Sequence, residues 1–440
     1  MGFPFIDVAR SVLQNAPQVI FNPGLGDPTA RFRFVFYWTM VFFAYTQYRK
    51  TARMQEQLYG TPRRSPLGLT VLAGIEGLIV GLIGSYLMTF FGVSFTPDGG
   101  GLVWVLVTAF ALMLLDPRLM CFSYAGGLVS LSYLLLGFPK VSVPALMGLV
   151  AILHLMESLL IFLNGSAGAT PVYLEQSGRP VGAFYLQRAW PVPVAILILA
   201  VVSPLQASGG IGMPDWWPLL RTSPEILAHP GAAFFIHALP AGLGYSDLAV
   251  TVSPKAKTRR TALHLAAYSL VLLVLAIGAT HFGLLVWVTA LFAPLGHEAI
   301  VRFGSRQERR GRPYFVPVEG AVMVLDVIPR SLAHRLGLGP GWLITDINGQ
   351  AVRGRDDLDQ ALEAAGQAGR LEFTARPPAF DRRGGQAGDG VRRFSSSFEP
   401  GAVLGVIPVP EPGDDMGLVL KTASPIRALL HKLFKGASGK

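Results

Sequence analysis

Long apolar runs separated by short polar stretches fill the chain up to Val301. A helix needs about 20 mostly apolar residues to cross the hydrocarbon core of a bilayer. The runs that best meet this requirement are 67–93, 119–138, 143–163, 231–252, 262–279 and 281–301, and shorter or more polar ones are 34–48, 102–115 and 192–207. The pattern predicts a polytopic α-helical membrane domain over residues 31–302, with about eight spans.

The basic residues indicate how these spans are oriented. Arg and Lys gather in the stretches 49–66 and 253–261 and in the segment that follows Val301, whereas 92–101 contains neither. Cytoplasmic loops carry an excess of Lys and Arg, so we expect these three stretches, and everything after Val301, to be cytoplasmic. Residues 1–30 carry Asp7 and Arg10 within an apolar stretch, which predicts an amphipathic surface or re-entrant helix.

Composition narrows the function classes. Of the residues, 51% are hydrophobic and 15% are charged, and the formal net charge is +10. Because the basic residues lie mainly between apolar runs, they indicate membrane orientation and no nucleic-acid partner. The single cysteine, Cys121, excludes an intrachain disulfide. The sequence contains no phosphate-binding loop and no dinucleotide fingerprint, and we predict no cofactor.

Several ionisable residues lie inside the predicted spans. They are His154, Glu157, Asp247, His297 and Glu298. Such residues are costly in lipid and usually face a bundle interior or a wet cavity. His154 and Glu157, three residues apart, share one helix face. These five residues are candidates for an intramembrane polar site, and the alternative is that they form interhelical hydrogen bonds or sit near helix ends.

The pair His297-Glu298 resembles the start of a zinc-protease motif. That motif needs a second histidine four residues after the first, on the same helix face, with the glutamate as base. Val301 occupies that position, and valine cannot bind zinc. We therefore predict no catalytic residues, no metal ligands and no enzymatic activity.

Charges become frequent after Phe303, and short strands alternate with helices. The pattern predicts strands at 321–327, 342–347 and 370–376, a short helix at 331–336, and an amphipathic helix at 356–365. The stretch "VMVLDVIPRSLAHRLGLGPGWLITDING" (322–349) resembles a bacterial PDZ domain. Matching positions are Val324, Val327, Pro329, Ser331, Ala333, Gly337, Leu338, Gly341, Ile344, Ile347, Asn348 and Gly349, whereas Leu332 and Trp342 depart from the usual Pro and Asp.

A PDZ domain binds an extended peptide between a sheet edge and a helix. The resemblance predicts a PDZ domain over 311–378, with a groove formed by Tyr314, Phe315, Val316, Val318, Gly320, Leu358, Ala361 and Leu362. No clear Gly-Leu-Gly-Phe loop is present there, so capture of a free C-terminus stays open, as does use of the domain as a rigid adaptor without a peptide. We expect a flexible linker at 379–401, then a C-terminal strand and a basic amphipathic helix within 402–440.

Other stretches resemble the MinJ family of bacterial membrane proteins. They are "DPRLMCFSYAGGLVSL" (116–131), "LMGLVAILHLMESLLIFLNG" (146–165), "GRPVGAFYLQRAWPVPV" (178–194), "AGLGYSDLAVTVSPKAK" (241–257), "APLGHEAIVRFG" (293–304) and "LGVIPVPEP" (404–412). The resemblance implies a multispan domain with a cytoplasmic PDZ domain, partners of the DivIVA and MinCD types, and a place in the plasma membrane at septum or poles.

Together these features predict a non-enzymatic membrane scaffold that contacts lipid and recruits cytoplasmic division or polarity proteins. Homo-oligomerisation stays open. Two other functions also stay open. One is a regulatory or degenerate partner of a site-2-type membrane protease, with the PDZ domain presenting substrate tails. The other is a carrier or sensor in which His154, Glu157 and Asp247 line a polar cavity.

Overall fold

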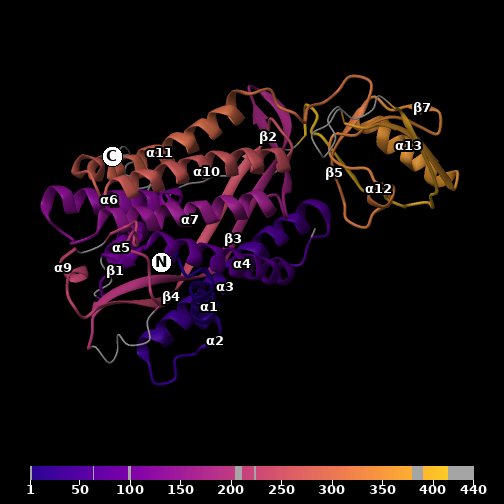
Figure 1. Cartoon of the computed structure of the whole chain (residues 1–440). Helices are drawn as coiled ribbons and strands as arrows, with labels where there is room; N and C mark the ends of the chain where they lie inside the picture. Colours follow the sequence, from indigo (N-terminus) through magenta and orange to yellow (C-terminus); the bar gives the residue numbers. More distant parts are fainter. Residues whose placement is uncertain are drawn as a thin grey trace, which may run out of the picture.

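The computed structural model describes residues 2–62, 64–97, 101–203, 211–221, 224–378 and 390–414. A long helical bundle carries a smaller, strand-rich unit at one end (Figure 1). We call residues 311–378 and 390–414 the C-terminal unit. The bundle contains α1 (Phe5–Asn15), α2 (Gln18–Phe21), α3 (Pro28–Tyr59), α4 (Pro66–Phe91), α5 (Leu102–Leu115), η1 (Pro117–Met120), α6 (Phe122–Leu136), α7 (Val143–Asn164), α9 (Pro224–Leu227), α10 (Pro254–Gly278) and α11 (Gly283–Arg310).

Four described helices are long and apolar enough to cross a membrane: α4, α7, α10 and α11. Three of them begin in the same way, with a serine cap and a proline in the first turn. The hydroxyls of Ser65, Ser142 and Ser253 each accept a hydrogen bond from a backbone N–H of that turn. Helix α7 lies at the centre of the bundle, whereas α11 exposes large apolar side chains on its outer face.

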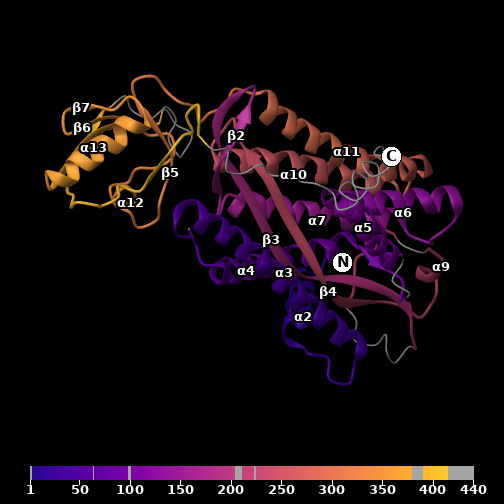
Figure 2. The ribbon, with the colours of Figure 1, turned by 180° about the vertical axis from the view of Figure 1, so that it is seen from behind.

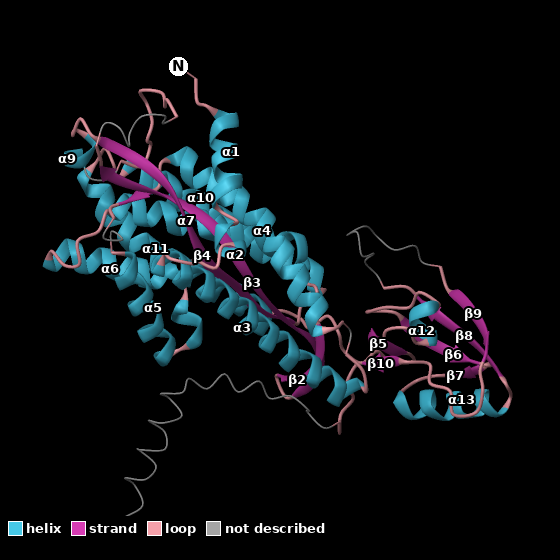
Figure 3. Ribbon diagram, turned by 90° about the horizontal axis from the view of Figure 1, so that it is seen from below, coloured by secondary structure: helices cyan, strands magenta, loops and turns pink. Residues whose placement is uncertain are grey.

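The prediction of helical spans at 231–252 and 192–207 is wrong. Strands β3 (Arg179–Val201) and β4 (Ala232–Ala249) occupy these runs and pair antiparallel from Phe184↔Ala249 to Val201↔Ala232. The hairpin runs along the length of the bundle, across α3 and α4 (Figure 3). The runs are apolar because most of β3 is buried between helices, and hydropathy cannot distinguish a buried strand from a buried helix. Pro193 and Pro240 inside these runs, and Pro191 directly before the first, disfavour a helix.

The edge of β3 that faces α3 and α4 shows how a strand can lie among apolar helices. A backbone N–H without a partner is costly where no water reaches it. Along this edge Pro191 and Pro193 have no N–H to satisfy. The flanking donors find partners: Ala189 N donates to Tyr48 Oη (3.1 Å), Ala195 N to Ser85 Oγ (2.7 Å) and Leu197 N to Val93 O (3.3 Å).

Two glycines of α4 allow the helix to approach this edge. A Cβ at Gly77 would lie 2.2 Å from Pro191 O, and a Cβ at Gly81 would lie 2.2 Å from Pro193 O. Both distances are well inside van der Waals contact, so the packing of α4 on β3 requires glycine at these two positions. Two short strands complete the sheet: β1 (Ser94–Phe95) and β2 (Thr170–Gln176) both pair with β3.

The C-terminal unit is a sheet with the order β10-β5-β6-β8-β9, to which β7 is added beside β6. Its strands are β5 (Val322–Val327), β6 (Leu343–Ile347), β7 (Gln350–Ala351), β8 (Arg370–Arg376), β9 (Arg392–Ser397) and β10 (Val406–Pro408), and its helices are α12 (Leu332–Arg335) and α13 (Arg355–Gln367). The order of elements from β5 to β8 matches the predicted one. A separate hydrophobic core lies between α13 and the sheet.

The segments that flank this core differ from the prediction. The part of the expected linker that the structure describes, 390–401, contains β9, which pairs with β8 from Arg370↔Ser397 to Ala375↔Arg392. Its Arg and Ser side chains point mostly to solvent, which is why its composition resembled a linker. The expected C-terminal strand is present as β10. The expected helix at 424–436 lies outside the described residues. At the other end of the chain, α1 buries Val8 and Val12 and exposes Ile6 and Leu13.

Candidate functional site

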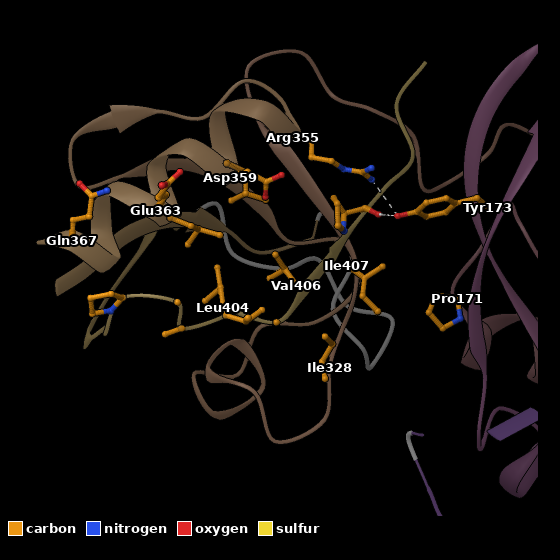
Figure 4. A pocket seen from close by; sticks show the side chains of 18 of the residues that line it. Pro171, Tyr173, Ile328, Arg355, Asp359, Glu363, Gln367, Leu404, Val406 and Ile407 are labelled. Atoms are coloured by element: carbon orange, nitrogen blue, oxygen red, sulfur yellow. Dashed lines mark hydrogen bonds between the residues drawn. The ribbon is translucent and has the colours of Figure 1, made fainter. Parts of the chain in front are cut away.

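A pocket of about 760 Å³ lies beside α13 of the C-terminal unit. Helix α13 forms one side, and the segment 400–408, which includes β10, forms the other (Figure 4). Strand β2 of the bundle reaches in from a third side with Pro171, Val172 and Tyr173. Because β10 ends the order of strands in the sheet, only one of its edges pairs with a described strand. The pocket is therefore a groove between a helix and a terminal strand.

Helix α13 gives the groove its apolar and its charged sides. Leu358 and Leu362, two of the residues predicted to form a peptide groove, line this pocket, with Asp359 and Glu363 beside them. Ala361 does not. It is 3% exposed and lies in the core between α13 and the sheet, to which Leu358, 2% exposed, also belongs at the base of the groove. Positions three and four apart share one helix face, but that face is divided here between the core and the groove.

The groove residues predicted within 311–320 do not line this pocket. Phe315 is fully buried against Phe184 of β3, with ring centroids 5.3 Å apart, and its carbonyl accepts a hydrogen bond from Gly182 N (2.9 Å). Tyr314 N donates to Val250 O (2.9 Å), and Val316 packs beside the same end of the β3–β4 hairpin. Burial raises the pKa of the Tyr314 phenol. This part of the segment is the joint between the bundle and the C-terminal unit.

The remaining two predicted groove residues form a turn. Val318 makes an isolated antiparallel bridge with Ala321, and Gly320 between them has a φ of 77°. Neither lines the groove, because β10, and not the segment 311–320, lies beside β5. The sequence feature that corresponds to this edge is the pair Leu404-Gly405 directly before a short apolar stretch. It lies about 80 residues beyond the expected place.

The loop that leads into β10 is fastened to the turn after β5. Ala333 N donates to Leu404 O (2.9 Å), and Ile328 N donates to Gly405 O (2.8 Å). Gly405 has a φ of 80°, and a Cβ on it would lie 2.2 Å from Ser331 Cβ. Both the backbone conformation and the close approach require glycine. The loop is thus held in one position at the end of the groove.

Strand β2 connects this groove directly to the helical bundle. The Tyr173 hydroxyl donates to Pro408 O (2.9 Å) and accepts from Arg355 Nη2 (3.3 Å), and Arg355 Nη1 pairs with Asp414 (2.6 Å). Burial raises the pKa of Tyr173, while the positive charge of Arg355 opposes that effect. Both β10 and the first turn of α13 are therefore fixed relative to the bundle.

The structure brings together only some of the predicted intramembrane polar residues. His154 of α7 and His297 of α11 have ring centroids 5.2 Å apart, and Cys121 lies between them. Glu298 does not join this group and accepts hydrogen bonds from Tyr124 and Arg302, both at 2.6 Å. Glu157 lies one turn further along α7 from His154.

Asp247 belongs to a different group. It lies near the end of β4, where its carboxylate is 3.0 Å from Lys257 Nζ. The same lysine lies 3.4 Å from Glu308, which also accepts hydrogen bonds from the backbone N–H groups of Val250 and Thr251. Asp247 lies apart from the other candidates because the run 231–252 forms a strand and not the predicted span. As part of a strand it helps to fix the exit of α11 towards the C-terminal unit.

The three basic stretches come together at the end of the bundle that carries the C-terminal unit (Figure 2). The ion pair of Lys257 with Glu308 joins the beginning of α10 to the end of α11. Gln176 at the end of β2 donates to Gly311 O (3.1 Å), and Gln55 near the end of α3 donates to Thr170 at the start of β2 (2.7 Å). The three stretches, which the charge pattern predicts to share one side of a membrane, lie together at this end of the bundle.

Comparison with known proteins gives one relative. The Bacillus subtilis (strain 168) protein "Cell division topological determinant MinJ" is 26% identical to the chain over 306 residues, which cover 66% of this chain and 72% of MinJ. The chain is similar to MinJ. No family model and no solved structure matches it. The resemblance noted in the sequence is thereby confirmed.

Proposed function

We propose that the protein is a non-enzymatic scaffold of the bacterial plasma membrane that recruits cytoplasmic cell-division proteins, of the DivIVA and MinCD types, through a PDZ domain. Two observations support the proposal. The chain is similar to a cell-division topological determinant, and four of its helices are apolar and long enough to cross a membrane. In this proposal the bundle anchors the protein, and the C-terminal unit presents a binding groove to the cytoplasm.

The observation that carries the proposal is the position of β10. It is a terminal strand of the sheet beside α13, and an apolar pocket lies between the two. An extended peptide can add to such an edge through main-chain hydrogen bonds while its alternate side chains enter the pocket. Leu358 and Leu362 provide the apolar surface, and Asp359 and Glu363 place negative charge on the α13 side. We infer a ligand segment with an apolar anchor and a nearby basic residue.

The location of the groove follows from charge. The stretches 49–66 and 253–261 and the residues after Val301 carry many of the chain's basic residues, and they gather at the end that holds the C-terminal unit. Lys and Arg are enriched in cytoplasmic loops. The C-terminal unit therefore belongs in the cytoplasm, where division proteins can reach it.

The test blocks the groove without removing core volume. Leu362 lines the pocket and is only partly buried, so Leu362→Arg fills the groove with a long charged side chain. Gln360→Arg is the matched control, because Gln360 is exposed on the same helix and does not line the pocket. Both variants should melt in detergent near the temperature of the wild type. A DivIVA-type or MinCD-type protein of the host, fused to a fluorescent protein, should lose septal or polar localisation only with Leu362→Arg.

The outcome is decided by comparing the two variants. If Leu362→Arg is stable and membrane-bound and the partner still co-localises as it does with Gln360→Arg, the groove is not the recruiting surface. If Leu362→Arg melts much earlier, a smaller obstruction at an exposed lining residue, Val403→Asp, replaces it, since Val403 is 71% exposed. Unchanged partner localisation with a stable Val403→Asp protein would equally refute recruitment through the groove.

A further inference from the structure

Three metal-ligating atoms from distant parts of the chain converge inside the bundle. Cys121 Sγ lies 3.0 Å from His154 Nε2 and 3.7 Å from His297 Nε2, and ligand atoms of the three residues all lie within 4.8 Å of one another. Cys121 caps the beginning of α6, His154 lies midway along α7, and His297 lies midway along α11. His154 is 3% exposed, and the other two are partly buried.

The histidine on α7 is held in the orientation that a metal ligand needs. His154 Nδ1 lies 2.7 Å from Val150 O, a carbonyl that can only accept. Nδ1 therefore carries the proton and donates, which leaves the lone pair of Nε2 directed at Cys121 Sγ. Metal-binding histidines commonly donate their other ring N–H to a backbone carbonyl in this way, which fixes the tautomer and the ring orientation.

The spacing of the three atoms suits a single ion. Zinc lies about 2.3 Å from sulfur and about 2.0–2.1 Å from imidazole nitrogen, so at tetrahedral angles a sulfur and a nitrogen ligand are about 3.5 Å apart. The two observed sulfur–nitrogen distances, 3.0 and 3.7 Å, lie on either side of this value. Small side-chain adjustments would bring both histidines to the same distance from one centre.

The donor set selects the kind of ion. One thiolate and two imidazoles suit Zn(II) and Cu(I), whereas Mg²⁺ and Ca²⁺ prefer oxygen. A fourth position is polar, because Ser123 Oγ lies 3.3 Å from His154 Nε2 and 2.7 Å from Tyr268 Oη. Four-coordinate Zn(II) would use a hydroxyl or a water there. Three-coordinate Cu(I) would leave that position empty and would make the site neutral, which an apolar bundle favours.

We propose that Cys121, His154 and His297 form a binding site for one d¹⁰ metal ion, Zn(II) or Cu(I), within the membrane domain. The ion replaces the thiol proton of Cys121, which leaves to water. The ion links the segment between α5 and α6, which contains Cys121, to helices α7 and α11. The site is structural, and it is independent of the groove in the C-terminal unit.

Metal content of the full-length protein tests the proposal. The protein is purified in mild detergent with a tag that contains no histidine, and zinc and copper are measured by plasma mass spectrometry. We expect about one equivalent of one of the two metals, and a reduction of about tenfold or more in Cys121→Ser, His154→Gln and His297→Gln. His281→Gln is the matched control, because His281 is exposed in the turn between α10 and α11, and this variant should retain the metal.

Reconstitution keeps the test informative where a variant is less stable. Wild-type protein stripped with a chelator should bind about one equivalent of Zn(II) or Cu(I), and its melting temperature should rise on binding, since a ligand of the native state stabilises it. Stripped Cys121→Ser should show neither effect. X-ray absorption should find one sulfur and two imidazole nitrogens around the ion. Failure of stripped wild-type protein to bind either ion, or binding by Cys121→Ser equal to wild type, would overturn the proposal.

Discussion

Replacing Ser85 by alanine tests how β3 is accommodated among apolar helices. Ser85 is fully buried in α4, and its hydroxyl donates to Gly81 O (2.6 Å) and accepts from Ala195 N (2.7 Å). Ser85→Ala leaves the N–H of Ala195, a fully buried residue, without that acceptor. An orphaned buried donor costs about 1–3 kcal/mol. Because about 1.4 kcal/mol is a factor of ten, the unfolding equilibrium should shift about 5- to 140-fold towards the unfolded state.

The measurement is thermal unfolding of the detergent-solubilised protein, followed by the fraction that stays monodisperse. Ser130→Ala is the matched control, since Ser130 is equally buried in α6 and its hydroxyl has no hydrogen-bond partner among the described residues. Ser85→Ala should melt earlier than wild type, and Ser130→Ala should melt at the same temperature or later. If both variants lose the same stability, the loss comes from the missing oxygen volume, and the account of the β3 edge is wrong.

Three further substitutions test other contacts. Gly81→Ala places a Cβ 2.2 Å from Pro193 O and should lower both melting temperature and abundance, whereas Gly74→Ala on the same helix meets nothing within 4 Å and should not. Glu308→Gln removes a charge that a buried lysine and two backbone N–H groups share, and should lower the free energy of unfolding by about 1.5–3 kcal/mol in thermal melts. Tyr173→Phe removes the hydrogen bond to β10, worth about 0.5–1.5 kcal/mol, and should speed amide hydrogen exchange at Val406 and Ile407 without changing exchange in α7.

The sequence by itself determined the elements whose physics is local. Helices α4, α7, α10 and α11 follow from the length of their apolar runs, and three of them begin with a serine followed by a proline in the first turn. The change of composition after Phe303, and the order of elements from β5 to β8, follow from periods of two and 3.6 residues. The similarity to MinJ was also visible in the residues alone.

Tertiary structure decided what depends on partners distant in the chain. Hydropathy predicts that 192–207 and 231–252 are buried, but it does not distinguish a strand from a helix. These runs form a hairpin because they pair with each other and pack against α3 and α4, with prolines along the edge of β3 that faces these helices. The edge of the groove is β10, because this strand pairs with β5. Which strands pair, when they are distant in the chain, cannot be read from the local sequence.

The polar residues in the bundle show the same division. Their presence in apolar runs identified them as candidates, because an ionisable side chain in lipid needs a partner. Which of them meet was decided by helix packing. Cys121 joins histidines that lie 33 and 176 residues further along the chain, while Asp247 is carried away to the exit of α11 by its strand. The sequence determines the chemistry of each side chain, whereas the packing and rotation of the helices and strands determine which side chains it contacts.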